Sequence, residues 1–400
     1  MLTNRQTFLQ YLGQTSPTPL MLEIVRAEGI FMFGPDGTKY MDLISGVSVS
    51  NIGHCHPQVV KAVKDQADLY MHLMVYGEII QSPQVKYAER LIGLLPPELN
   101  SCYFVNSGSE AVEGAMKLAK RFTGRSRILS FINSYHGSTQ GALSIQGNEH
   151  YRNSFRPLLP DVYHLEFNSE VSLNRIDKNT ACVIVEPVQA EAGVILPENN
   201  FLGKLKSKCR ETGSLLIFDE IQTGFGRTGS LFAINKFNVV PDILLLAKAL
   251  GGGMPLGVFI SSVEIMNSLI SNPVLGHITT FGGHPVCCAA GLASLNVIID
   301  ENLVESCSSK SAVFKKELTH VLITEIRGDG LLLAVQLKKP EYVNYVISHA
   351  PDYGLILDYF LFCNDAFRIA PPLTISYSEI SYACIQLIKL LDEAMNSVKT

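Results

Sequence analysis

The feature that most constrains the fold of this chain is a regular alternation of short apolar runs with longer, helix-patterned stretches. The runs are rich in β-branched and aromatic residues, and they occupy positions 102–105, 128–132, 162–167, 182–185, 215–218, 243–246 and 257–260. Parallel strands need crossover connections of about a dozen or more residues, usually helices. The pattern therefore predicts an α/β fold in which a largely parallel sheet is covered on both faces.

The connections and the C-terminal part predict how the chain is divided. Residues 110–122 and 200–212 have helical periodicity, and Gly213 is a typical helix terminator. After about residue 290 the pattern changes to long helices, a hairpin-like alternation over 323–337 and 368–373, and a closing helix from Glu379. We predict an N-terminal arm at 1–45 that packs with a small domain, a large domain at 46–290 and a small α+β C-terminal domain at 291–400.

Composition excludes several classes of protein. Apolar residues make up 47% and charged residues 17% of 400 residues, which excludes disorder and favours an oligomer whose surface is partly covered. A net charge of −5 argues against a nucleic-acid partner. Nine cysteines, two of them adjacent, form no disulfide framework or zinc motif. Without a signal sequence or a run of about 20 apolar residues, we expect a cytoplasmic protein with no membrane partner.

Polar residues follow four of the predicted strands at the point where each strand ends. Glu186 ends one strand, Asp219 ends the next, Lys248 follows a third, and Asn106 opens a helix after a fourth. Ligands of open α/β sheets bind outside the carboxyl ends of the strands. We therefore expect two acids, a lysine and a helix N-terminus to meet at one edge of the sheet.

Each of these groups allows a structural or a chemical role. Ser107 and Glu110 have the spacing of a capping box, and with Gly108 and Ser109 this helix start is either an ordinary cap or a phosphate cradle. Lys248, followed by glycines at an apolar strand end, is either a surface lysine or a desolvated amine able to form a Schiff base.

Asp219 and Tyr135 also allow more than one role when each residue is considered alone. Asp219 needs a cationic partner, which could be a pyridinium nitrogen, although metal ligation or helix capping is also open. Tyr135, in Tyr-His-Gly after a strand, is either a core aromatic or the cover of a cofactor ring. Their occurrence together, in this order, favours a cofactor site.

These motifs resemble those of the class III aminotransferases, a family of pyridoxal 5′-phosphate (PLP) enzymes of fold type I, from about residue 22 to about 391. The motifs are N-S-G-S-E-A-V-E from Asn106, Y-H-G from Tyr135, E-P-V-Q-A-E-A-G from Glu186, F-D-E-I-Q-T-G-F-G-R-T-G from Phe218, A-K-A-L-G-G-G-M-P-L-G from Ala247, T-F-G-G-H-P from Thr280 and R-I-A-P-P-L from Arg368. The resemblance implies a seven-stranded, mostly parallel sheet in a large domain beside a smaller α+β domain.

The resemblance also implies roles for single residues. Lys248 is the lysine that forms the Schiff base and moves the proton, and Asp219 pairs with the pyridinium nitrogen. Gly108 and Ser109 hold the phosphate, while Tyr135 stacks on the ring. The remaining cofactor-binding residues implied are Ser107, His136, Glu186 and Gln222, the last near the 3-oxygen of the ring.

Two further roles concern the partner subunit and the substrates. Thr280 reaches the cofactor phosphate of a neighbouring subunit, which implies a homodimer with shared active sites. Glu191 and Arg368 form a gate that is closed for the amine donor and opens when the carboxylate of a 2-oxo acid takes Arg368.

Two positions depart from the better-known branches and bear on the donor. Ser138 stands where ornithine, acetylornithine and 4-aminobutyrate aminotransferases commonly have a carboxylate-binding arginine, and Val47 stands where ornithine aminotransferases have a tyrosine. Ser138 with the following T-x-G-A-L resembles the diamine and diaminobutyrate branches. We expect transfer of the terminal amine of an ω-amino or diamino acid to a 2-oxo acid, with 2-oxoglutarate as acceptor.

Several alternatives stay open. A PLP-dependent aminomutase or decarboxylase uses the same lysine and aspartate, and a noncatalytic PLP-binding paralogue is a more distant possibility. Residues 224–229 read G-x-G-x-x-G, but four residues separate them from the strand and no helical pattern follows, which disfavours a dinucleotide site. His54 and His56 form one H-x-H without a third ligand nearby, so we expect no metal.

Overall fold

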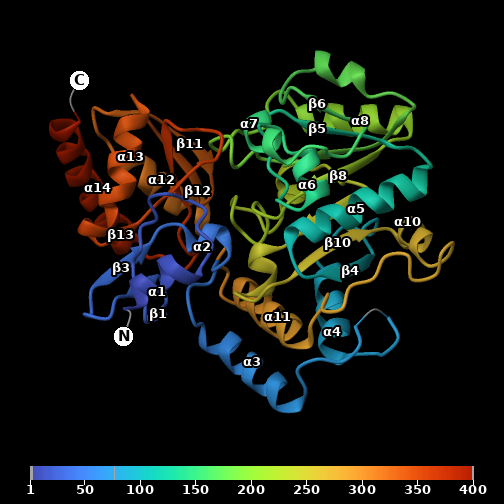
Figure 1. Cartoon of the computed structure of the whole chain (residues 1–400), viewed down its shortest axis with the longest axis horizontal. Coiled ribbons are helices and arrows are strands. Elements are labelled where there is room, and N and C mark those ends of the chain that lie inside the picture. The colour runs from blue at the N-terminus through green and yellow to red at the C-terminus, as the bar shows by residue number, and fades with distance from the viewer. Residues whose placement is uncertain (1–2, 76, 399–400) are drawn as a thin grey trace.

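The computed structural model describes residues 3–75 and 77–398, and its larger unit is built on a seven-stranded sheet (Figure 1). The strand order is β4 (Ser101–Val105), β10 (Gly257–Ser261), β9 (Ile243–Leu246), β8 (Leu215–Asp219), β7 (Thr180–Val185), β5 (Arg127–Phe131) and β6 (Val162–Leu165). β10 is antiparallel to both of its neighbours, and the other pairs are parallel. The predicted α/β class and its seven strands are confirmed.

Both faces of this sheet are covered, because successive side chains of each strand point to opposite faces. Ile217 packs with α5 (Gly108–Thr123) on one face, while Phe218 packs with α8 (Phe201–Thr212) and α11 (Pro285–Asp300) on the other. α3 (Pro57–Leu69) and α4 (Ser82–Ile92) in turn pack on α11. The helices predicted over 110–122 and 200–212 are therefore present. The short helices of this unit are α6 (Gln140–Ile145), α7 (Glu149–Arg152), α9 (Ala233–Phe237) and α10 (Val263–Met266).

The smaller unit contains an antiparallel sheet with its own hydrophobic core. Its strand order is β11 (Ile323–Asp329), β12 (Leu332–Leu337), β15 (Ala366–Ile369) and β14 (Asp358–Tyr359), and its helices are α12 (Cys307–Glu317), α13 (Pro340–His349) and α14 (Tyr377–Ser397). The predicted hairpin over 323–337 is confirmed. The last predicted strand ends early, at Ile369, because Pro371 and Pro372 have no N–H to donate to a ladder.

The N-terminal segment belongs with the smaller unit (Figure 1). It contains α1 (Asn4–Tyr11) and the strands β1 (Arg26–Glu28), β2 (Phe31–Phe33) and β3 (Lys39–Asp42). β3 pairs in parallel with β13 (Leu355–Ile356). The predicted domain boundaries stay a prediction, and residue 290 lies inside α11.

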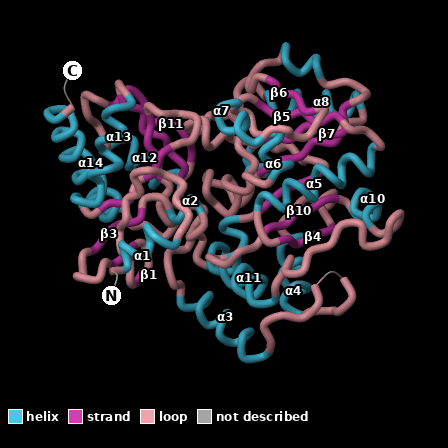
Figure 2. Tube along the Cα trace, viewed as in Figure 1, coloured by secondary structure: helices cyan, strands magenta, loops and turns pink. Residues whose placement is uncertain are grey.

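Loops and the short turn α2 (Ser45–Ser48) lie between the two units, as the pink tube between the two groups of magenta strands in Figure 2 shows. Arg227, from the G-x-G-x-x-G loop, is fully buried at this junction. Its Nη1 donates to the carbonyl oxygens of Leu331 and Pro371, at 3.0 and 2.5 Å, and its Nη2 donates to Asn51 Oδ1. The glycine loop therefore joins the units and does not open a helix, as a dinucleotide site requires.

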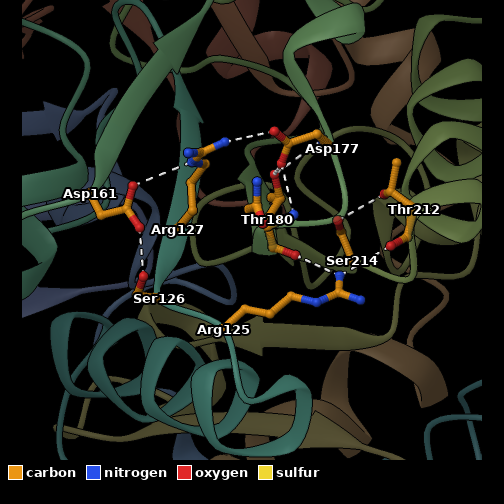
Figure 3. Close-up of polar contacts among 9 residues, drawn as sticks. Arg125, Ser126, Arg127, Asp161, Asp177, Thr180, Thr212 and Ser214 are labelled. Atoms are coloured by element: carbon orange, nitrogen blue, oxygen red, sulfur yellow. Dashed lines mark hydrogen bonds and ion pairs between the residues drawn. The ribbon is translucent and has the colours of Figure 1, made fainter.

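Side-chain contacts hold together the amino ends of three neighbouring strands, β5, β7 and β8, at the end of the sheet away from the cavity side (Figure 3). Arg125 Nη1 donates to the carbonyl oxygens of Thr180, Thr212 and Gly213, at 3.0, 3.1 and 3.0 Å. Arg127 forms ion pairs with Asp161 and Asp177. These contacts fix the starts of β5, β7 and β8, and so the relative positions of the residues at their far ends. Within the described ranges no helix is long and apolar enough to cross a membrane.

Candidate active site

A cavity of about 420 Å³ lies at the carboxyl ends of the central strands. Nine of the residues predicted for the cofactor line it: Ser107, Gly108, Ser109, Tyr135, His136, Glu186, Asp219, Gln222 and Lys248. They come from the ends of five strands, β4, β5, β7, β8 and β9, and from the loops that follow, as the order of parallel strands predicts. The site that the sequence indicated is thus one continuous cavity.

The N-terminus of α5 forms one wall of this cavity. Ser107 Oγ accepts the N–H of Glu110 at 3.2 Å, as expected for a helix cap. The reciprocal half of the predicted capping box is wrong, because the Glu110 carboxylate accepts the backbone N–H and the side-chain amide of Asn106, at 2.7 and 2.8 Å. The helix start therefore keeps its N–H groups and its positive dipole end directed at the cavity.

Lys248 is half-buried and lines the cavity, at the start of a 3₁₀ turn after β9. Its Nζ donates to Gln222 Oε1 at 2.9 Å. Burial lowers the pKa of Lys248 to about 8; Glu191, then Asp219 and Glu186 act against this shift, and Arg368 adds to it. The lowered pKa leaves a larger fraction of this amine neutral and nucleophilic near neutral pH than in an ordinary lysine, as the apolar strand end predicted.

Asp219 is held by two donors in this buried region. Its Oδ2 lies 2.7 Å from His136 Nδ1, and its Oδ1 accepts the N–H of Ile221 at 3.1 Å. The Nε2 of His136 is buried without a partner in the described chain. Two contacts fix the orientation of this side chain, so it presents its oxygens to the cavity in one position.

Glu186 is the second acid of the cavity. It accepts the backbone N–H groups of Tyr135 and Ala190, at 2.8 and 3.1 Å. Burial and the nearby Asp219 raise the pKa of Glu186 to about 8. Glu186 is therefore largely protonated at neutral pH, and it orients the Tyr135 turn.

The turn from Tyr135 to Ser138 contacts the start of α5. Tyr135 OH lies 3.2 Å from Ser138 Oγ, and the N–H of Ser138 donates to Ser109 Oγ at 3.3 Å. Ser138 is exposed and carries no charge, so the position that the family resemblance makes relevant to donor carboxylates offers only a hydroxyl.

Glu191 and Arg368, which lie 177 residues apart in the chain, form a buried ion pair beside the cavity. Arg368 Nη2 donates to Glu191 Oε1 at 2.6 Å, and Leu361 N–H donates to the other oxygen at 3.1 Å. The ring of Phe360 covers the guanidinium at 4.7 Å. The contact predicted between Glu191 and Arg368 is thus present, and it corresponds to the closed form of the predicted gate.

Two other predicted residues lie outside the cavity lining. Val47 is half-buried in α2 with φ of 62°, a conformation that is strained for a β-branched residue, and Val49 lines the cavity in its place. Thr280 is exposed in a loop whose neighbour Thr279 accepts from Asn106 Nδ2 at 3.0 Å.

Sequence reasoning missed part of the lining. Val49, Ile221, Thr223 and the run from Met254 to Leu256 complete the cavity walls. Met254 and Pro255 stood inside a recognised motif without a role, while nothing in the local pattern marked Val49. His54 Nε2 lies 2.8 Å from Asp42 Oδ2, and His56 Nε2 lies 3.7 Å from Glu301 Oε1, so the two imidazoles have separate partners.

Comparisons with known proteins point to one family. The family model described as Aminotransferase class-III matches residues 12–391. An acetylornithine aminotransferase of Methanopyrus kandleri is 39% identical over 373 residues, which cover 92% of this chain and 94% of the relative. A [LysW]-aminoadipate semialdehyde/glutamate semialdehyde transaminase of Sulfolobus acidocaldarius is 39% identical over 79% of this chain and 82% of its own.

A solved structure agrees with these sequences. The ornithine aminotransferase of Toxoplasma gondii superimposes with a TM-score of 0.89 at 30% identity, covering 98% of this chain and 96% of that protein. That structure has PLP at partial occupancy in its active site.

Proposed function

The chain belongs to the class III aminotransferases, which are PLP-dependent enzymes, and we propose that it transfers the terminal amine of an ω-amino or diamino acid to 2-oxoglutarate. The observation that carries the proposal is a single cavity that joins a half-buried lysine of lowered pKa, a fixed aspartate and a helix N-terminus. The Glu191–Arg368 pair lies beside it. Relatives named for acetylornithine and aminoadipate semialdehyde support a donor with an ω-amine.

The residues of the cavity fit PLP. Among residues 3–75 and 77–398, Gln222 Nε2 and His136 Nε2 are buried polar atoms without partners, so this part of the site has unused hydrogen-bonding capacity. An added Cβ at Gly108 would meet Ile221 Cδ1 at 2.9 Å, so a larger residue at the helix start would require the Ile221 side chain to shift. Gly108 and Ser109 are suited to hold the phosphate at the N-terminus of α5, with Asp219 opposite the ring nitrogen.

The proposed chemistry assigns the proton transfer to Lys248. When bound, PLP supplies an electron sink for the carbon that loses its proton. Lys248 Nζ, with its pKa lowered to about 8, takes and returns that proton at neutral pH. Gln222 Oε1, at 2.9 Å, orients the amine, and His136 keeps the Asp219 carboxylate in place. The apolar walls at Met254 and Leu256 exclude water from the reacting atoms.

Arg368 is the group proposed to recognise the acceptor. A 2-oxo acid has a carboxylate that matches a guanidinium in a bidentate arrangement. Glu191 holds that guanidinium in the closed form and must leave it when the acceptor enters. The same site thereby accepts a donor with Glu191 in place and an acceptor with Glu191 displaced.

We also assign a homodimer to this enzyme, and the cytoplasm as its location. An exposed apolar surface supports the dimer: Leu69, Met71, Ile80 and Phe281 are each more than half exposed, and the ring of His72 lies 4.7 Å from that of Phe281. Thr280 lies in the same loop as Phe281, where it could reach the phosphate of a second subunit.

The function is tested with the purified protein loaded with PLP. Ornithine, acetylornithine, diaminobutyrate and 4-aminobutyrate are each added without acceptor, and the visible absorbance of the bound cofactor is followed. We expect at least one donor to bleach it and 2-oxoglutarate to restore it. No bleaching by any donor would refute the ω-amine donor, and turnover without an acceptor would indicate the aminomutase or decarboxylase.

The role of Lys248 has its own test. Lys248→Ala should retain PLP more weakly and lose its visible band and all turnover. An unchanged band and rate would remove Lys248 from the mechanism. Failure of the wild-type protein to retain PLP through dialysis would support a noncatalytic paralogue.

A further inference from the structure

A second carboxylate faces the guanidinium of Arg368 from the side away from Glu191. β14 pairs with β15, and their register places Asp358 directly opposite Arg368. Asp358 Oδ2 lies 3.8 Å from Arg368 Nη1. Because a strand pair fixes this neighbour, Asp358 keeps its place when Glu191 moves away.

The guanidinium has unused donors on the side of Asp358. The Arg368 side chain is 1% exposed, yet its Nη1 and Nε have no hydrogen-bond partner in the described chain. Glu191 engages Nη2 alone, and Asp358 is beyond hydrogen-bond distance. Buried donors left unsatisfied are costly, so each of these nitrogens is free to donate to an incoming anion, and Nη1 is the one beside Asp358.

Any carboxylate that reaches Nη1 comes close to Asp358. The side chain of Asp358 is 35% exposed and its Oδ1 accepts the N–H of Tyr359 at 2.8 Å, while none of the described residues donates a hydrogen bond to its Oδ2. Two carboxylates and one guanidinium leave this cluster with a net charge of −1 when all three are ionised. Like charges at such separations repel strongly in a partly buried site.

We propose that Asp358 is a specificity-determining residue that weakens the binding of carboxylates at Arg368 and favours donors whose distal group is cationic. The inference rests on the proposed function, because Arg368 is there the acceptor's carboxylate site. In the donor half of the reaction, Glu191 and Asp358 together make the surroundings of Arg368 attractive to an ammonium group. In the acceptor half, Asp358 shortens the residence of the 2-oxo acid and of the dicarboxylic product.

Binding of glutarate to the PLP-loaded enzyme tests the proposal, because this unreactive dicarboxylate needs no turnover. Asp358→Asn removes the charge and keeps the shape, Asp358→Glu keeps the charge, and Asp358→Ser is a second neutral variant should Asn impair folding. Asp365→Asn is the matched control, since Asp365 is bonded to Gln336 Nε2 at 2.8 Å in the same hairpin and does not contact Arg368. Calorimetry gives the Kd of each variant.

We expect Asp358→Asn and Asp358→Ser to bind glutarate about tenfold more tightly, which corresponds to about 1.4 kcal/mol. The KM for 2-oxoglutarate should fall likewise, while the KM for a diamino donor rises. Asp358→Glu and Asp365→Asn should bind glutarate as the wild type does.

An equal or weaker glutarate affinity in both folded neutral variants would overturn the proposal, as would the same gain in Asp365→Asn. A failure of the proposed function would give a different result. In that case no donor would turn over in the wild type, although the neutral variants would still bind glutarate more tightly. That result would leave the effect of Asp358 on Arg368 in place.

Discussion

Arg227 forms buried hydrogen bonds at the junction between the two units. Replacing Arg227 by leucine tests whether these hydrogen bonds hold the two units together. The substitution leaves three buried acceptors without a donor, the carbonyl oxygens of Leu331 and Pro371 and Oδ1 of Asn51. Each unsatisfied buried acceptor costs about 1 to 3 kcal/mol. Removal of a buried cation, whose pKa burial lowers to about 10, returns part of this cost. We expect a net loss of about 3 kcal/mol in the free energy of unfolding.

A matched control separates the junction from the general loss of an arginine. Arg125 also donates to three carbonyl oxygens, but all of them lie within the larger unit (Figure 3). Urea unfolding is followed by far-ultraviolet circular dichroism in the wild type, Arg227→Leu and Arg125→Leu. We expect Arg227→Leu to split the transition into two, one for each unit, and Arg125→Leu to lower a single midpoint.

The junction also positions the acceptor site. Pro371 follows β15, which carries Arg368, so loosening it displaces Arg368 from Lys248. Arg227→Leu should therefore raise the KM for 2-oxoglutarate more than it lowers kcat. A single unfolding transition at the wild-type midpoint, with an unchanged KM, would refute the reasoning.

Three further predictions concern the cavity. His136→Ala removes the 2.7 Å contact with Asp219 and should weaken PLP retention about tenfold, since hydrogen bonds to charged groups contribute about 1.5 to 3 kcal/mol. Equilibrium dialysis measures the affinity for PLP, and an affinity equal to that of the wild type would contradict the prediction. The rate at which the cofactor-free protein takes up PLP should rise as the pH passes through about 8, the lowered pKa of Lys248, and then level off, whereas a rise continuing to 10.5 would contradict the lowered pKa. The pKa of Glu186 is raised from 4.5 to about 8, so its contribution to stability is complete below pH 4.5 and is lost as the pH rises through 8. Urea titrations of the cofactor-free protein should show this fall in unfolding free energy, and Glu186→Gln should reduce it.

The sequence by itself determined the class of fold and the content of the cofactor cavity. The two periodicities of apolar residues predicted strands and helices, and parallel strands bring their carboxyl ends to one edge wherever they occur. Lys248, Asp219, Glu186 and the start of α5 could therefore be placed together from local pattern alone. The family resemblance added the pairing of Glu191 with Arg368.

Only the tertiary structure decided the contacts between segments far apart in the chain. Asp358 stands opposite Arg368 because β14 and β15 pair in one register, and a shift of one residue would direct its side chain to the other face of the sheet. His136 reaches Asp219 across 83 residues, and Arg227 joins three segments that show no common pattern. Such contacts depend on how whole elements pack, while sequence periodicity reports only which face of each element is buried.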